Sequence, residues 1–466
     1  MSSPENSARI QENDAYEGLY GLTDDLVARV RAVLAGGGDG ETVPGLVAPL
    51  HAADMADLLE QLSGNDRDAV IRLLGDQLDS EVWCYLDEGV RESIVEALGT
   101  ERLATIVRDL ASDDAIDLIE DLDEEDRKEL LDAVPAHTRA LYQQSLSWPE
   151  GSAGRLMQRE VATVPDFWDV GRTIDQLRRN PQTMPPEFYG IVIVNAAYRP
   201  VGTVRLSRLL SSPRDSLMTA IMDENPKIIP ATMDQEDAAF LFRQYGLVEA
   251  PVVDADGRLT GVVTIDDIVE VLGEAYEDDI LKMGGVRSDD LYSDFLETTR
   301  ARFSWLLINL GTAIAASLVI AIFETTLEKI VALAVLMPIV ASMGGNAGTQ
   351  TLTVTVRALA TNQLTPANVV RVVGKEILAG GFNGVLFALL MAVAAWLWFA
   401  DPLLGLVIGV AMIINMLVAG LAGTLIPLGL QKAGFDPAIS STVFLTTVTD
   451  VVGFFAFLGL AAWILV

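Results

Sequence analysis

Five long apolar runs in the last third of the chain constrain its fold more than any other feature of the sequence. They occupy residues 303–323, 330–356, 377–399, 403–428 and 439–466. As helices rising about 1.5 Å per residue, all of them can cross a hydrocarbon layer roughly 30 Å thick. Lipid offers the backbone no hydrogen-bond partners, so a spanning segment must be a helix or part of a closed barrel. We therefore predict a five-span α-helical transmembrane domain over residues 303–466.

The last run contains one ionisable residue near its middle, Asp450. A carboxylate inside a bilayer is costly unless it faces a partner, a polar cavity or an ion path. Thr446, Asp450 and Gly453 follow one another at i, i+4 and i+7, so they share one helix face. This small, polar face favours pore lining over lipid contact. The alternative is an interior aspartate that is hydrogen-bonded to a neighbouring helix.

The second run contains the other unusual segment, MPIVASMGGNAGTQTLTVTV (337–356). Pro338, Gly344 and Gly345 weaken a helix in mid-membrane and free carbonyl groups that must be bonded inside the protein. The alternating threonines look strand-like, but an unpaired strand cannot stand in lipid, so we predict a helix with one polar flank. Gly344 and Gly348 form a pair typical of close helix packing. Packing alone does not explain Asn346 between them.

Charge is divided sharply between the two parts of the chain. Of its 32 basic and 65 acidic residues, 25 basic and 59 acidic ones lie before position 300, a net charge of −34 there. This balance argues against nucleic acid or anionic lipid as the ligand of the first part and favours cations. Surface acids also serve solubility. A lone cysteine, Cys84, excludes an intrachain disulfide and fits a reducing compartment.

The basic residues near the apolar runs predict the orientation in the membrane. The start of the chain lacks the pattern of a signal peptide, so we expect the first apolar run to direct insertion. One side of the spans carries a single basic residue, Lys329, and the side of the N-terminus carries the others: Arg300, Arg302, Arg357, Arg371, Lys375 and Lys432. The positive-inside rule therefore predicts a cytoplasmic N-terminus and an external C-terminus.

The part before the membrane divides into a helical domain and a region of mixed strands and helices. Residues 1–20 are polar and predicted to be a disordered tail. Residues 21–150 have helical periodicity, and ADMADLLEQLSGNDRDAVIRLL (53–74) recurs as DDAIDLIEDLDEEDRKELLDAV (113–134). An internal repeat of this kind predicts helical hairpins stacked into a small superhelix.

A second repeat follows, over residues 151–213 and 214–275. Each copy gives strand, turn, strand and helix, and the turn DADG (254–257) between two valine-rich strands is a strong hairpin signal. The pattern resembles a tandem pair of CBS domains. The resemblance implies an adenosine-binding motif at Gly261, Thr264 and Asp267, whose carboxylate would bind the ribose. The first copy has arginines at the two polar positions, so ATP would use the second copy; a dimerising scaffold without a nucleotide is the alternative.

Taken together, these features resemble the MgtE family of magnesium channels and transporters over nearly the whole chain. The most specific matches are GGNAGTQ (344–350) and TTVTDVVG (446–453), and RALAT (357–361) and the acidic connecting helix at 276–302 agree. The resemblance implies a homodimer with one axial pore. In it Asp450 would hold a hydrated magnesium ion, Thr446 would take a neighbouring position, and Asn346 would lie near the gate. Gly345 and Gly453 belong to the same two pore segments.

The resemblance also implies that intracellular magnesium binds acids of the cytosolic domains and holds the pore shut. The residues that match these sensing acids are Glu81, Asp113, Asp117, Glu236, Asp267, Asp278, Asp279 and Asp436. Acids gathered beside a pore mouth repel one another, and a divalent cation relieves that repulsion. Ala275 and Gly246 stand where the family usually has acids, so we expect at least one sensor site to be weak or missing.

From these features we predict a magnesium-selective, channel-like transporter of the plasma membrane, gated by intracellular magnesium, with no enzymatic activity. Its ligands would be Mg²⁺ and, as a further candidate, ATP; its partners would be membrane lipid and a second copy of the chain, and not nucleic acid. One alternative is a carrier of another divalent cation, such as Mn²⁺ or Co²⁺. The other is a nucleotide-sensing membrane regulator, which Asp450 and Asn346 argue against because a scaffold needs no polar groups in mid-bilayer.

Overall fold

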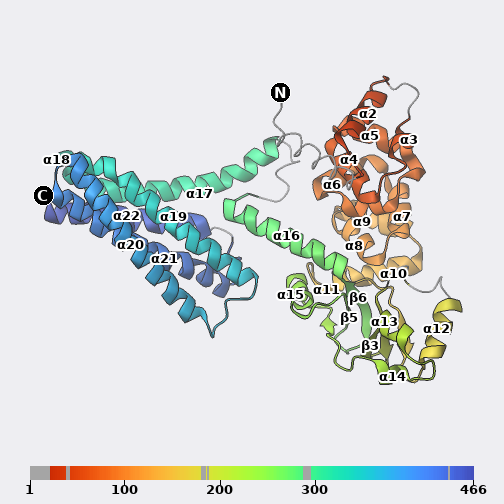
Figure 1. Cartoon of the computed structure of the whole chain (residues 1–466). Helices are drawn as coiled ribbons and strands as arrows, with labels where there is room; N and C mark the ends of the chain where they lie inside the picture. Colours follow the sequence, from red (N-terminus) through yellow and green to blue (C-terminus); the bar gives the residue numbers. More distant parts are fainter. Residues whose placement is uncertain (1–20, 38–41, 180–184, 186–187, 287–294, 439–440) are drawn as a thin grey trace, which may run out of the picture. The chain divides into compact units, whose positions relative to one another are not determined.

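A computed structural model describes residues 21–466 except 38–41, 180–184, 186–187, 287–294 and 439–440. The predicted disordered tail, residues 1–20, lies outside the described residues. The chain forms two compact units, Met1–Gly273 and Glu274–Val466. We describe each unit by itself (Figure 1).

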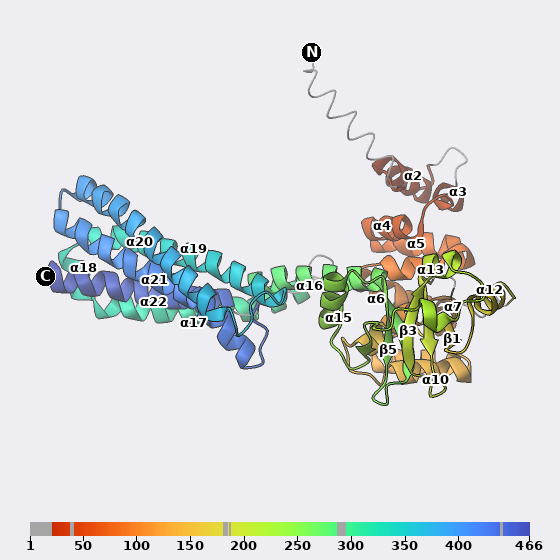
Figure 2. The ribbon, with the colours of Figure 1, turned by 60° about the horizontal axis from the view of Figure 1, so that its bottom comes forward.

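The N-terminal domain of the first unit is a stack of short helices around one apolar core, as the internal repeat predicts (Figure 2). Its elements are α2 (Asp24–Leu34), α3 (Val43–Val47), α4 (Ala52–Gln61), α5 (Gly64–Leu74), η1 (Gly75–Gln77), η2 (Ser80–Tyr85), α6 (Glu88–Leu98), α7 (Thr100–Asp109), α8 (Ser112–Glu120), α9 (Glu124–Ala133) and α10 (Ala136–Ser145). Side chains of Ser63 and Asp123 accept hydrogen bonds from the first turns of α5 and α9, which fixes where these helices begin.

Two matched arginines show that the sequence repeat is also a structural repeat. Arg67 Nε donates to the carbonyl oxygen of Leu59 at 2.8 Å. Arg127, 60 positions later, donates from Nε to the carbonyl oxygen of Ile119 at 3.1 Å. Both side chains thus bind the last carbonyl groups of the preceding helix, which have no partner within that helix. Each hairpin, α4–α5 and α8–α9, is closed in the same way.

The rest of the first unit contains two small sheets with the same topology. Its elements are α11 (Ala153–Leu156), β1 (Thr163–Pro165), α12 (Val170–Arg179), β2 (Gly190–Val194), β3 (Pro200–Arg205), α13 (Leu206–Ser211), α14 (Met218–Ile221), β4 (Ile229–Pro230), α15 (Gln235–Tyr245), β5 (Glu249–Val253) and β6 (Leu259–Thr264). In each sheet the first strand pairs parallel with the second, and the second pairs antiparallel with the third. The predicted tandem repeat is therefore confirmed.

A methionine from each repeat packs into the core of the other repeat's sheet, where it lies against a glycine. A Cβ atom on Gly202 would lie 2.8 Å from Met222 Cγ, and one on Gly261 would lie 2.7 Å from Met157 Sδ. Each glycine thus admits a methionine that belongs to the other repeat. The DADG turn closes β5–β6 as predicted, with Gly257 at φ +74°, a conformation that glycine adopts without strain.

The second unit consists of long helices. They are α17 (Phe295–Ile322), α18 (Glu324–Lys329), α19 (Ala332–Ala360), α20 (Val369–Phe399), α21 (Pro402–Lys432) and α22 (Ser441–Ile464), and α16 (Ile265–Gly284) contributes its second half. Among the described residues, five helices are long and apolar enough to span a membrane, as predicted. The helices run past the apolar runs, so Arg357 and Lys375 lie inside them. The short helix α18 was not predicted.

Helix α21 is the centre of the membrane bundle. It is the most buried of the five spans and packs against α19, α20 and α22. Helix α19 runs without interruption through Pro338 and the glycines that follow it. The prediction of a helix with one polar flank is confirmed, because Ser342, Asn346, Gln350 and Thr353 lie on its exposed face.

Candidate functional site

The glycine-rich segment of α19 presents two faces of opposite character. Gly344 and Gly348 are buried, and they admit Asn415 of α21 and Leu445 of α22 respectively. Gly345 faces open space, because no atom lies within 4 Å of the Cβ that an alanine would place there. Close packing and an exposed polar face therefore share one helix.

Two contacts place Asn346 and Asp450 at nearly the same depth in the bundle. Gly344 of α19 and Gly453 of α22 both pack against the side chain of Asn415, so these two glycines lie at one level. Four residues further along α19, Gly348 packs against Leu445, which comes eight residues earlier on α22. The two helices therefore run antiparallel. Residues that lie between these two contacts are at similar depths in the bundle. Asn346 on α19 and Asp450 on α22 are two of them.

Asp450 has no described partner for its carboxylate. The residue is half-buried, and among the described residues no hydrogen bond or ion pair to it occurs. The nearby hydroxyl of Thr446 lies 3.0 Å from the carbonyl oxygen of Thr442, so it bonds back to its own helix. The alternative of an aspartate bonded to a neighbouring helix is not what the described contacts show. A carboxylate left free at this depth suits a cation path.

Our sequence reasoning missed two polar residues of the bundle, Asn415 and Glu376. Asn415 is fully buried, and its Nδ2 donates to the carbonyl oxygen of Val340 at 2.8 Å. Its Oδ1 has no hydrogen-bond partner. Glu376 lies in the second turn of α20, because that helix begins at Val369 and not at the apolar run. A single amide or acid inside or beside an apolar run is the signal that could have found both.

Two of the predicted sensing acids, Asp113 and Asp267, come together in the first unit. Burial, with the Asp267 carboxylate as a second cause, raises the pKa of Asp113 to about 8. Burial also raises the pKa of Asp267 to about 7, although the Thr264 hydroxyl opposes this shift. Asp113 Oδ1 is buried without a hydrogen-bond partner. A cation or a proton between these groups would remove an unfavourable charge pair.

Asp117 forms an ion pair with an arginine of the same chain. Arg91, whose side chain is buried, donates from one terminal nitrogen to Asp117 at 2.6 Å and pairs through the other with Asp121 at 2.6 Å. Glu81 and Glu236 are exposed. Among the described residues, no group of three or more His, Cys, Asp or Glu side chains is arranged to hold a metal ion by itself.

The predicted sensing acids of the second unit surround a lysine. Lys282 Nζ lies 2.7 Å from Asp436 Oδ2 and also pairs with Asp278. Both carboxylates raise the pKa of Lys282, against the effect of its burial. Burial, and then the charge of Asp436, raises the pKa of the neighbouring Asp279. The last turns of α16 are further attached to α22 by the Thr442 hydroxyl, which donates to the carbonyl oxygen of Met283.

Two residues of the predicted nucleotide motif are hydrogen-bonded to each other. Thr264 Oγ1 donates to Asp267 Oδ2 at 2.7 Å, so these two residues lie together. Gly261 instead packs against Met157. Because the Asp267 charge also acts on Asp113, a ribose bound at this carboxylate would alter that interaction. Gly246 has φ +62° and ends α15, where a glycine fits better than an acid.

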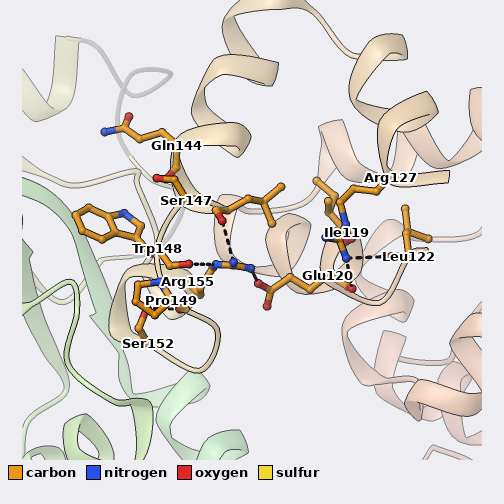
Figure 3. A network of polar contacts seen from close by, with 11 residues as sticks. Ile119, Glu120, Leu122, Arg127, Gln144, Ser147, Trp148, Pro149, Ser152 and Arg155 are labelled. Carbon is orange, nitrogen blue, oxygen red and sulfur yellow. Dashed lines mark hydrogen bonds and ion pairs between the residues drawn. The ribbon is translucent and has the colours of Figure 1, made fainter. Parts of the chain in front are cut away.

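The joint between the helical domain and the second sheet, against which α11 packs, includes Arg155 (Figure 3). Its guanidinium donates to the carbonyl oxygens of Trp148 and Leu146, both at 2.8 Å, and forms an ion pair with Glu120 of α8. Glu120 ends the helix that begins beside Asp113. Arg155 thus links the end of α8 to α11.

Comparison with known proteins places the chain in a family. The divalent cation transporter model of MgtE matches residues 337–460, the MgtE intracellular N domain matches 50–151, and a CBS domain matches 218–274. The magnesium transporter MgtE of Thermus thermophilus is 32% identical over 436 residues, which cover 92% of this chain and 96% of that protein. The chain belongs to the MgtE family. The magnesium transporter MgtE of Bacillus subtilis is 26% identical over 440 residues, 94% of this chain and 97% of that one.

Among solved structures, the cytosolic domain of the Mg²⁺ channel MgtE in complex with ATP is similar to part of this chain. It is 27% identical, has a TM-score of 0.48, and covers 53% of this chain and 99% of that structure. The family models, the relatives and the five candidate spans confirm the resemblance to MgtE and the predicted fold class, a helical N-domain, CBS domains and five spans. The chain is a multi-pass membrane protein of the MgtE family.

Proposed function

We propose that the chain is a magnesium-selective, channel-like transporter in which Asp450 selects the ion. The observation that carries this proposal is the matched depth of Asn346 and the partnerless Asp450 on two antiparallel helices. Mg²⁺ gives up water reluctantly and takes oxygen ligands, so a carboxylate that acts through the water shell suits it. The family relatives carry the name magnesium transporter. We assign no enzymatic step to the chain.

A second copy of the chain would complete the pore. The exposed polar face of α19, with Asn346 and Gln350, would be costly against lipid. On a twofold axis this face meets its own copy, and two Asp450 carboxylates would neutralise one divalent cation. We therefore propose a homodimer with one axial pore, Thr446 and Gly345 beside it, and Gly453 holding α22 against Asn415. The N-terminus would be cytoplasmic and the C-terminus external, in the plasma membrane.

We further propose that intracellular magnesium closes this pore by binding the acids of the soluble domains. The buried Asp113 Oδ1, which has no hydrogen-bond partner, fits a cation held between Asp113 and Asp267. Asp279 would serve in the same way at the connector, beside Asp278 and Asp436. Asp113→Asn combined with Asp267→Asn should keep uptake active at magnesium concentrations that close the wild type. Closure of this double variant at the wild-type concentration would refute the role of the pair.

ATP is a candidate ligand of the second repeat, through Thr264 and Asp267. Since the Asp267 carboxylate also acts on the pKa of Asp113, ATP and magnesium would be linked thermodynamically at this residue. In calorimetry on the full-length protein, Asp267→Ala should abolish ATP binding, and Arg208→Ala should leave it unchanged. Absence of ATP binding by the wild type would refute this assignment.

Uptake into liposomes tests the selectivity site. We expect the full-length wild-type protein to admit Mg²⁺, with Mn²⁺, Co²⁺ and Ca²⁺ as competitors that report the preferred cation. Asp450→Asn keeps the shape of the side chain and removes its charge, so Mg²⁺ uptake should be lost while the dimer persists. Glu328→Gln, which neutralises an exposed acid on the short helix α18, is the matched control. Uptake by Asp450→Asn at the wild-type rate and selectivity would refute the assignment.

A further inference from the structure

A cavity of about 400 Å³ lies between α19, α20 and α21. Its polar side chains are those of Asn346, Gln350, Thr351, Glu376 and Asn383. The described residues that line the cavity do not include any from α22, the helix that carries Asp450. The cavity therefore adjoins the predicted pore segment of α19 but is built by a different set of helices.

Glu376 is the charged group of this cavity. Its side chain is 13% exposed, and the Thr351 hydroxyl donates to its Oε2 at 3.2 Å. The basic group near it, Lys375 Nζ, lies 3.7 Å from Oε1 on a side chain that is 77% exposed. Within the described residues, no buried cation neutralises the Glu376 carboxylate. Glu376 immediately precedes the apolar run of α20, and a mostly buried carboxylate there with so little compensation marks a candidate functional site.

The backbone holds this carboxylate in place. A Cβ on Gly420 would lie 2.9 Å from the carbonyl oxygen of Glu376, so α20 and α21 are in close contact there. Thr351 lies seven residues after Gly344 on α19, which is about 10 Å along the helix. The cavity thus runs from the depth of Asn346 and Asp450 toward the C-terminal end of α19.

The lining selects a class of ligand. Carboxamide, hydroxyl and carboxylate oxygens are the ligands that hard cations prefer, and the negative charge disfavours phosphate and anionic lipid headgroups. Six waters at roughly 30 Å³ each fill about 180 Å³, so the cavity has room for a cation with its inner water shell. We propose that this cavity is a second cation site, which holds a hydrated divalent cation through Glu376 and the surrounding carboxamide oxygens. The inference rests on the proposed function in taking Mg²⁺ as the transported ion.

The site can be tested without measuring transport. The experiment uses the full-length protein with its native cysteine removed by Cys84→Ser. The Asn383→Cys variant places one thiol in the cavity. The control, Phe382→Cys, places the thiol on the adjacent residue, which is 68% exposed on the surface of the spanning helix and does not line the cavity. A charged, membrane-impermeant methanethiosulfonate reagent should modify the first thiol and not the second. Added Mg²⁺ should slow modification of the first.

Glu376→Gln keeps the size of the side chain and the acceptor for Thr351 but removes the charge. It should raise the Mg²⁺ concentration that gives half protection by about tenfold, whereas Lys432→Gln, at the exposed end of α21 and outside the cavity lining, should leave it unchanged. An unreactive Asn383→Cys, protection that Mg²⁺ does not provide, or protection that survives Glu376→Gln would each overturn the proposal.

Liposome uptake separates this inference from the proposed function. If Asp450→Asn abolishes Mg²⁺ uptake but Mg²⁺ gives no protection at Asn383→Cys, the pore assignment stands and the second site falls. If Mg²⁺ protects the cavity but the wild type takes up no Mg²⁺, the chain binds the cation there without transporting it. That result would remove the proposed function and leave the site.

Discussion

The contact between Gly344 and Asn415 gives the sharpest test of the bundle, through the substitution Gly344→Ala. The new Cβ would lie 2.7 Å from Asn415 Cγ, about 1 Å closer than carbon atoms normally approach. Overpacking of this kind costs roughly 1–3 kcal/mol. The displaced carboxamide would also weaken its hydrogen bond to Val340, for about 0.6 kcal/mol more.

The matched control is Gly345→Ala, the same exchange one residue later. No atom lies within 4 Å of its new Cβ, so it gains only the helix propensity of alanine, roughly 0.5–1 kcal/mol. Gly344→Ala receives that gain too, so the difference between the two variants isolates the clash. With about 2–4 °C per kcal/mol for a domain of this size, their thermal midpoints should differ by roughly 3–14 °C, with Gly344→Ala lower.

The assay is thermal unfolding of the full-length protein in detergent, followed through the membrane unit. A double variant, Gly344→Ala with Asn415→Ala, removes the group that clashes and should recover part of the loss. Equal midpoints for the two single variants, or no recovery in the double variant, would refute the packing argument and with it the matched depth of Asn346 and Asp450.

Three further predictions concern charged groups outside the spans. Because Asp113 has a pKa raised to about 8 by burial and by Asp267, protonation stabilises the native state: this contribution is complete below about pH 4 and is lost as the pH rises through 8. The thermal unfolding midpoint of the first unit should therefore decrease as the pH is raised from 6 to 8.5. The decrease should be less steep in Asp113→Asn. Lys282→Gln should speed hydrogen exchange at the end of α16 without Mg²⁺, and Mg²⁺ at Asp436 should restore protection. Arg155→Lys loses the two-carbonyl contact and should destabilise the soluble unit by about 1–3 kcal/mol in denaturant titration.

Much of the architecture could be predicted because its signals are local or repeat along the chain. The apolar runs give the five spans, and the 60-residue repeat gives the paired hairpins closed by Arg67 and Arg127. The helix ends were less predictable. Helix α20 extends beyond its apolar run through charged residues such as Lys375. A helix that emerges at the membrane surface can continue without apolar side chains.

The polar contacts of the bundle could not be predicted in the same way. Asn415 matters because glycines from two other helices converge on it, and convergence of distant segments leaves no local pattern. Glu376 likewise depends on Thr351, 25 residues away. Sequence reasoning identified the polar face of α19 and the Asp450 position, but not the groups behind them.

The described contacts divide the predicted sensing acids by what already neutralises them. Asp117 is paired with Arg91, and Asp436 with Lys282. A divalent cation that binds these acids must displace the arginine or lysine side chain that the fold holds beside them. Asp113 has no such partner, so a divalent cation there competes only with the proton that the raised pKa of Asp113 favours. If magnesium gates the pore as we propose, the Asp113–Asp267 pair should therefore take up magnesium at a lower concentration than the connector acids once the pH is high enough to ionise the pair, because Lys282 already neutralises the connector acids in part.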